Sequence, residues 1–396
     1  MNRPPRIALL SVRIGAGHFR AAEAVAEGLR RLEPEAQIDH LDAFRFFNPV
    51  FRASFMGFYT GMLRAAPGAW RSMYEAMELR PAGHWTHRFN AWFDRQHAGR
   101  LRAHLQRADY DAVVCTHYLP VEVCAHLRRA GKLRAPLHVV LTDFQIHTMW
   151  IQPGVDRYHV ATPEMADALR TKAGPKPQID ATGIPILAAF GDESEPREAL
   201  RLRLGLEPGR PVALVAGGGF GLGAGARLVE TLAEAIPCTQ WLCIAGTNRA
   251  LLEDLNRAAI RFPGRIRTFG YVENMHELTR AADLAVTKCG GLTSSECLAR
   301  GLPMVVVHPI PGQEERNADF LLECGVAVRP HGTAQLIFKV RELFQEPERL
   351  ERMRFAARHA ARPQAQDSIA RAILGPTAAA APVPTAPARL AATMAV

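Results

Sequence analysis

A single histidine stands in a turn of small residues near the start of the chain, in the stretch SVRIGAGHFRAAEAV. The apolar run RIALLSV precedes this turn, and a helical pattern follows it at Ala22, Val25, Ala26, Leu29 and Leu32. This order predicts a buried strand, a turn and a helix, with His18 where the helix starts. The positive end of a helix dipole keeps imidazole neutral, which is the form that a general base needs.

Two interpretations of His18 stay open from this stretch alone. The histidine either removes a proton from a substrate or merely caps the turn. A dinucleotide fingerprint needs a third glycine where Arg20 stands, so the turn does not match that motif. A turn after the first strand is nevertheless a common ligand position in open α/β sheets.

Two segments of the second half suit a nucleotide. The first, AGGGFGLGAG, follows an apolar run and precedes a helical pattern, so amides and a helix dipole could approach a pyrophosphate. The glycines expected at the pyrophosphate are Gly217, Gly218, Gly219 and Gly221.

The second segment, VTKCGGLTSSECLARGLPMVVVHPIPGQEERNA, carries more polar chemistry. We expect Thr293 and Ser294 to cap a helix, and Glu296 in its first turn to accept both hydroxyls of a ribose. The alternative for Glu296 is compensation of the helix dipole. Polar side chains able to hold sugar hydroxyls follow at Gln313, Glu314 and Asn317.

These residues need a scaffold of strands and helices in alternation. Strand-like runs recur as RIALLSV, DAVVCTH, LHVVLTD, RYHVATP and IDATGIP, and then as PVALVAGGG, QWLCIAG, RIRTFGY, LAVTKCG and MVVVHP. The pattern predicts two doubly wound, Rossmann-like α/β domains facing a cleft, at residues 1–187 and 188–375. Residues 376–396, rich in alanine and proline, are expected to form a disordered tail.

The net charge of +9 is concentrated in one segment. Residues 44–107 hold ten arginines against Glu75, Glu78 and Asp94, a net of +7, and aromatic residues alternate with these arginines. Such a pattern favours adhesion to an anionic bilayer, and no nucleic-acid module accompanies it. The alternative is a packed helical hairpin whose arginines are solvated.

Composition excludes several other classes. Seven cysteines without a CxxC pair argue against a disulfide framework or a zinc site. His138, Asp143 and His147 lack the close ligand motif that a metal site needs, so we expect no metal and no cofactor. Without a long apolar run or a leader, the protein is expected in the cytoplasm.

Five motifs in this order resemble a known family: GAGH, TDFQIHTMW, AGGGFGLG, GYVENM and KCGGLTSSECLARGLPMVVVHPIPGQEERNA. The chain is similar over about residues 6–368 to processive diacylglycerol glucosyltransferases and monogalactosyldiacylglycerol synthases. It is more distantly similar to the lipid II N-acetylglucosaminyltransferase. The resemblance implies the two-domain glycosyltransferase-B fold.

The resemblance also implies site roles. In the carboxyl half, the 217–221 glycines would hold the diphosphate of a UDP-hexose, the backbone of Tyr271 and Val272 the uracil, and Glu296 the ribose. The phosphate or hexose would contact Gly291, Thr293, Gln313 and Glu314. In the amino half, His18 would lie near the acceptor hydroxyl and residues 44–92 at the membrane. The acceptor and membrane contacts would come from Gly17, Arg52, Phe55, Tyr59, Arg64, Trp70, His147 and Trp150.

The expected reaction is an inverting, metal-independent transfer of glucose or galactose from UDP-hexose to the sn-3 hydroxyl of diacylglycerol. It would take place on the inner face of the cell membrane, with His18 as base and Asp143 as second candidate for base or for orienting His18. Ala16 interrupts the glycine series that relatives often carry before the histidine. The alternatives are another lipid acceptor, such as an undecaprenyl-linked sugar or a sphingoid lipid, and a non-catalytic, UDP-sugar-responsive membrane-binding protein.

Overall fold

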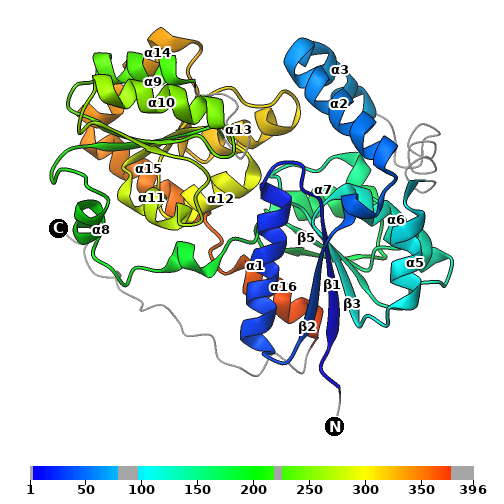
Figure 1. The fold of residues 1–396 in the computed structure, drawn as a ribbon. Coiled ribbons are helices and arrows are strands. Elements are labelled where there is room, and N and C mark those ends of the chain that lie inside the picture. Colours follow the sequence, from blue (N-terminus) through cyan, green and yellow to red (C-terminus); the bar gives the residue numbers. More distant parts are fainter. Residues whose placement is uncertain (1–2, 79–96, 218–224, 376–396) are drawn as a thin grey trace.

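The computed structural model describes residues 3–78, 97–217 and 225–375, and within them two parallel six-stranded sheets flanked by helices (Figure 1). The first sheet has the order β2-β1-β3-β4-β5-β6. Its strands are β1 (Arg6–Ser11), β2 (Gln37–Asp42), β3 (Ala112–Cys115), β4 (Leu137–Val140), β5 (Arg157–Val160) and β6 (Gln178–Ala181). The second sheet has the order β12-β11-β10-β7-β8-β9. Its strands are β7 (Val212–Ala216), β8 (Gln240–Ile244), β9 (Ile266–Phe269), β10 (Leu284–Thr287), β11 (Met304–Val306) and β12 (Ala327–Val328).

Helices connect the parallel strands of both sheets. Those of the first half are α1 (Gly17–Leu32), η1 (Ala43–Phe46), α2 (Pro49–Ala65), α3 (Pro67–Glu78), α5 (Gly99–Arg107), α6 (Tyr118–Arg129), η2 (Thr148–Trp150) and α7 (Pro163–Ala173). Those that follow are η3 (Ala188–Gly191), α8 (Arg197–Arg203), α9 (Ala226–Ala235), α10 (Arg249–Arg261), α11 (Met275–Ala281), α12 (Gly291–Ala299), α13 (Gln313–Glu323), α14 (Thr333–Gln345), α15 (Pro347–Ala360) and α16 (Ala365–Leu374).

Each sheet has one point where the strand order reverses. In the first sheet it lies between β1 and β3, and in the second between β7 and β10. Loops that leave the carboxyl ends of two such strands diverge and open a crevice, where ligands of open α/β sheets bind. The topology therefore predicts ligand-binding residues in the turns after β1, β3, β7 and β10.

All ten strand-like runs of the sequence form strands, which confirms the predicted α/β class. The sequence pattern missed β2 and β12. β2 is an edge strand of mixed polarity, QIDHLD, and most of it is half-buried. β12 has two residues, too few for any periodic signal.

The last described helix returns to the first sheet. α16 follows the helices of the second half, yet it packs along α1, where a Cβ on Gly28 would lie 2.7 Å from the carbonyl oxygen of Gln366. Glycine is thus required for this close approach. The division at residue 187 stays a prediction, and the predicted tail, residues 376–396, lies outside the described residues.

Helices α2 and α3 form a hairpin that stands beside α13 of the second half (Figure 1). Aromatic side chains of η1 and α2 anchor its base, with Phe44, Phe47 and Phe51 in mutual contact. The side chains of α3 reach α13 through two ion pairs, Arg71 with Glu315 and Glu78 with Arg316. The predicted helical segment continues to residue 92, and residues 79–92 lie outside the described part of the chain.

Candidate active site

His18 lies in the first turn of α1, directly after the switch point of the first sheet. Its Nδ1 lies 2.7 Å from the backbone carbonyl oxygen of Thr116 and 2.9 Å from Oγ1 of Thr142. The carbonyl only accepts, so Nδ1 carries the proton and the lone pair of the neutral ring is on Nε2. Among the described residues, Nε2 has no hydrogen-bond partner. The ring is thus held in the tautomer that can accept a proton from a ligand.

The surroundings of His18 favour its neutral form. Burial lowers its pKa below the ordinary value of histidine, and the nearby carboxylate of Asp143 raises it in part. The rings of His117 and Trp150 flank it, with centroids 4.6 Å and 6.4 Å from that of His18. Neutral imidazole with a free Nε2 is the state required of a general base at neutral pH.

Asp143 is held by α13 rather than by His18. Its Oδ2 accepts a hydrogen bond from Nε2 of Gln313 at 2.8 Å, and its Oδ1 accepts one from Nδ2 of Asn317 at 2.9 Å. Asn317 in turn accepts from the backbone N–H of Phe144 at 2.8 Å. Both oxygens of Asp143 are therefore engaged across the two halves, and the contacts that orient His18 come from Thr116 and Thr142.

The amino terminus of α12 faces the turn that holds His18. A Cβ on Gly291 would lie 2.0 Å from the carbonyl oxygen of Thr142, and a Cβ on Gly17 would lie 3.8 Å from Leu292. The predicted caps are wrong: α12 begins at Gly291, so Thr293 and Ser294 lie inside the helix, and Glu296 lies beyond the first turn. Only glycine at 291 allows this approach of the two halves.

Glu296 sits between α12 and α1 near Arg20. Burial raises the pKa of Glu296 to about 8, and the charge of Arg20 lowers it in part. Arg20 also donates to the hydroxyl of Tyr271 at 2.9 Å, a contact between the first and second halves. Glu296 is therefore mainly protonated at neutral pH, and Arg20 links its surroundings to Tyr271, the residue predicted at the uracil.

Glu314 is committed to a local ion pair. Its Oε1 lies 3.3 Å from Nζ of Lys288, and its Oε2 accepts from the backbone N–H of Ile310 at 2.7 Å. Burial raises its pKa despite the charge of Lys288. These contacts join the loop after β10 to the start of α13, so Glu314 helps to shape the loop that carries Gln313.

Several residues predicted on the acceptor side pack within or against the α2–α3 hairpin. Tyr59 stacks edge-on against Trp70 at 5.2 Å, and burial with the charges of Glu314 and Asp143 raises the pKa of Tyr59 to about 12. Phe55 packs against Phe44 at 5.7 Å. His147 holds α3, because its Nε2 donates to the carbonyl oxygen of Tyr74 at 3.1 Å.

The predicted arginines of the membrane segment differ in their surroundings. Arg71 is ion-paired with Glu315, and Nε of Arg52 is buried without a partner among the described residues. The side chain of Arg64 lies outside what the structure describes. The exposed face of α2 is apolar instead, with Val50 74% and Phe58 53% exposed.

The diphosphate site is only partly described. Gly217 follows β7 at the second switch point and is buried. Gly218, Gly219 and Gly221 lie outside the described residues. Val272 is partly buried against the core, and Thr293 is half-buried in α12.

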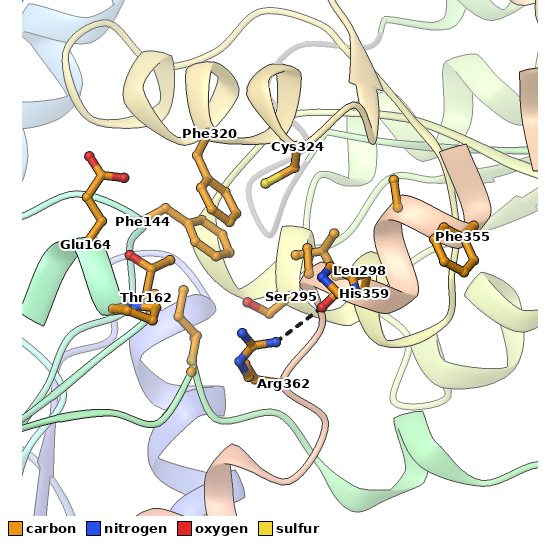
Figure 2. Close-up of a pocket in the computed structure, with 16 residues that line it drawn as sticks. Phe144, Thr162, Glu164, Ser295, Leu298, Phe320, Cys324, Phe355, His359 and Arg362 are labelled. Carbon is orange, nitrogen blue, oxygen red and sulfur yellow. Dashed lines mark hydrogen bonds between the residues drawn. The ribbon is translucent and has the colours of Figure 1, made fainter. Parts of the chain in front are cut away.

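A separate cavity of about 500 Å³ lies between the halves, on the side of α15. Figure 2 shows Phe144 and Phe320 meeting across it, and their rings stack at 4.3 Å. None of the predicted donor or catalytic residues lines this cavity. It is therefore an interdomain hollow that lies apart from His18 and the residues that contact it.

The described residues show neither a metal-binding cluster nor a membrane-spanning helix. They contain no group of three or more histidine, cysteine, aspartate or glutamate residues that could hold a metal ion. In the same ranges, no helix is long and apolar enough to span a bilayer.

Several site residues escaped the sequence patterns. Thr116 and Thr142 make the contacts that orient His18, and Arg20 reaches across to Tyr271. One signal was present for the two threonines, since each directly follows an apolar strand run, VVC or VVL, in a parallel sheet. Such positions share one edge of the sheet with the turn after β1.

Comparisons with known proteins agree with this arrangement. Residues 18–186 match the family model of monogalactosyldiacylglycerol (MGDG) synthase, and residues 213–369 match the glycosyltransferase family 28 C-terminal domain. A processive diacylglycerol beta-glucosyltransferase of Bacillus thuringiensis (strain Al Hakam) is 29% identical over 375 residues, covering 94% of both chains. The same figures hold for the protein of that name from Bacillus cereus (strain AH187).

Solved structures identify the fold. MurG of Acinetobacter baumannii superimposes with a TM-score of 0.61 at 17% identity, covering 94% of this chain and 99% of that one. A UDP-glucosyltransferase of Polygonum tinctorium gives a TM-score of 0.61 at 14% identity, covering 95% and 100%. The two-sheet architecture is that of the glycosyltransferase-B fold, which confirms the predicted fold class.

Proposed function

We propose that this chain transfers a hexose from UDP-hexose to diacylglycerol, because its two halves match the MGDG synthase and glycosyltransferase family 28 models and it is similar to diacylglycerol glucosyltransferases over 94% of its length. The observation that carries the mechanism is the tautomer of His18, whose Nδ1 proton is held by Thr116 and whose Nε2 is free to accept a proton. The ring lies where α1 meets α12, so a base of the first half faces the expected donor site of the second.

The reaction is a single inverting displacement at the anomeric carbon. Nε2 of His18 removes the proton of the sn-3 hydroxyl as the hydroxyl oxygen bonds to that carbon, and the bond to the departing UDP oxygen breaks. Backbone amides at the start of α12 and after β7 stabilise the diphosphate, because a helix amino terminus favours negative charge. The step needs no metal in this scheme. Asp143 acts at a distance by its charge on His18 and by holding Gln313.

The hairpin of α2 and α3 would bring the enzyme to the acceptor. The exposed apolar side chains Val50 and Phe58 lie on α2, and positive charge surrounds them in sequence. An apolar helical face with nearby arginines adheres to an anionic bilayer. We place the protein peripherally on the inner face of the cell membrane for this reason.

The test uses purified protein with dioleoylglycerol in anionic vesicles and either UDP-glucose or UDP-galactose. We expect a glycosyldiacylglycerol with one of the two donors, detected by mass spectrometry. His18→Ala should still bind UDP in calorimetry but lose about 10² to 10⁴ in turnover, the range for a missing general base. His331→Ala is the matched control, since His331 is exposed just before α14 and its backbone N–H donates to Gln335.

Two outcomes would contradict the proposal. Product formed only with a different lipid, such as an undecaprenyl-linked sugar or a sphingoid lipid, would keep the enzyme class and change the acceptor. UDP binding without any product from lipid extracts would favour a sensor that responds to UDP-sugars at the membrane.

A further inference from the structure

A basic hollow of about 680 Å³ opens at the amino-terminal end of the first sheet, the opposite end of the strands from His18. Its wall includes His138 of β4 and Arg157 of β5, with Asp156 just before β5. The last turn of α16 closes one side through Ala372 and Ile373. No residue placed in the active site lines this hollow.

The charge of the hollow is unbalanced. Four cationic side chains line it, Arg128, Arg129, Arg157 and Lys176, against one carboxylate, Asp156. Asp156 pairs with Arg128 at 2.6 Å, and Asp180 lies 3.5 Å from Arg157. Within the described ranges, Arg129 and Lys176 have no carboxylate partner. The two uncompensated charges match a dianion.

A buried histidine pair adds a donor to the same wall. Nδ1 of His138 lies 3.2 Å from Nε2 of His159, and the two rings are parallel. Nδ1 of His159 is buried with no partner in the part of the chain that the structure describes. An orphaned N–H is rarer than an orphaned acceptor, so His159 donates from Nε2 and leaves its Nδ1 unprotonated. His138 then accepts at Nδ1 and carries its own proton on Nε2.

We propose that this hollow is a binding site for a phosphate dianion, held by Lys176, Arg129 and Arg157 together with the Nε2–H of His138. Phosphate is the anion that this set fits best, because it takes several N–H donors at once and carries close to two charges. Bound there, it would also join the end of α6, the start of β5 and the loop before β6, and so stabilise the fold.

A free phosphate fits the position better than a lipid headgroup. The hairpin lies at the carboxyl-terminal end of the first sheet (Figure 1). The hollow is lined instead by residues at the amino-terminal ends of β4 and β5. A molecule docked on a bilayer by α2 would hold the hollow away from the surface. This choice of source, although not the site itself, rests on the proposed function.

The experiment is isothermal titration of the full chain with inorganic phosphate at constant ionic strength, in the presence of saturating UDP so that the donor site is filled. We expect saturable binding of one phosphate. Lys176→Gln should weaken it about threefold to fivefold, as expected for loss of one exposed charge contact. Lys172→Gln is the matched control, an exposed lysine on α7 outside the hollow, and should leave the affinity unchanged.

Three results would overturn the proposal. The first is the absence of saturable heat up to about 20 mM phosphate, where a site of millimolar affinity would be filled. The second is an equal loss in the Lys172 and Lys176 variants, which would indicate general screening. The third is Lys176-dependent binding to phosphatidate vesicles without binding of free phosphate. UDP affinity and transferase activity are measured separately, so failure here leaves the proposed function untouched.

Discussion

His18 and Asp143 are coupled by charge rather than by a hydrogen bond, and this makes their roles separable. Burial holds the pKa of His18 below its ordinary value. On the acid side of the pH profile, kcat/KM should therefore begin to decrease only at a pH below about 6.5. The carboxylate of Asp143 raises that pKa, so Asp143→Asn should move this decrease to still lower pH. The measurement is the pH profile of both proteins with one donor.

Two other outcomes of that experiment would contradict these roles. An unchanged pH profile in the Asp143 variant would mean that its charge does not reach His18. Activity that disappears in Asp143→Asn but persists in His18→Ala would make Asp143 the base. Asn317→Ala is a useful companion, because it removes one amide from Asp143 while leaving the carboxylate charge.

Glu296 should release a proton when UDP binds. Burial raises its pKa to about 8 in the empty cleft, so it is mainly protonated at pH 7. Ribose hydroxyls that donate to the carboxylate favour its charged form, so UDP affinity should rise with pH until about 8. Calorimetry at pH 7 in two buffers of different ionisation enthalpy measures the released proton. Glu296→Gln should abolish the release and weaken UDP by about 1 to 3 kcal/mol.

If Glu296→Gln binds UDP as tightly as the unchanged protein, Glu296 is not part of the donor site. Ser295→Ala is the neighbouring control, since its hydroxyl donates to the backbone of Gly291 within the helix.

The sequence located the reactive types but not the groups that orient them. His18, Glu296 and Gln313 stand in motifs whose spacing was visible along the chain. Thr116 and Thr142 contact His18 from 98 and 124 residues away. No local pattern encodes such a contact, because it depends on which strands become neighbours.

At the scale of elements, the hairpin adds detail that composition does not give. The sequence pointed to arginines at the membrane, yet Arg71 pairs with Glu315 of α13. The exposed face of α2 carries Phe58 and Val50 instead. The α12 boundary failed for a related reason: Gly291 starts the helix because the approach to Thr142 needs glycine there, which overrides the preference for threonine or serine caps.

We therefore expect Phe58→Glu to weaken binding to anionic vesicles by tenfold or more, since burying a phenylalanine contributes about 1.5 to 3 kcal/mol. Phe338→Glu is the control, because Phe338 is 61% exposed on α14, away from the hairpin. A sedimentation assay measures the vesicle binding of both variants. Equal binding of the two would mean that α2 does not contact the membrane.

At the scale of the whole molecule, the buried histidine pair makes stability depend on pH. Burial lowers the pKa of His138 to about 4 and that of His159 well below its ordinary value. The unfolded chain takes up these protons near pH 6.5, so the stability is complete above that pH and falls as the pH drops toward 4. The free energy of unfolding, measured by chemical denaturation, should be lower at pH 5 than at pH 7 by about 2 kcal/mol or more because of this pair. His138→Gln should reduce the difference.

The close contact between the two halves at Gly291 yields the last prediction. A Cβ there would lie 2.0 Å from the carbonyl oxygen of Thr142, whose hydroxyl lies 2.9 Å from His18. In Gly291→Ala the halves must separate, and the base then moves away from the donor. Since about 1 Å of misplacement can cost about 10² in rate, we expect kcat to fall about a hundredfold.

The folded state of this variant should survive, because alanine favours helix over glycine by about 1 kcal/mol. UDP affinity, measured by calorimetry, should change by less than about threefold, a difference of about 0.65 kcal/mol. Gly191→Ala is the control, since a Cβ there meets nothing within 4 Å. Full turnover in Gly291→Ala would mean that the reaction does not require the close contact between Gly291 and Thr142. A residue other than His18 would then have to act as the base.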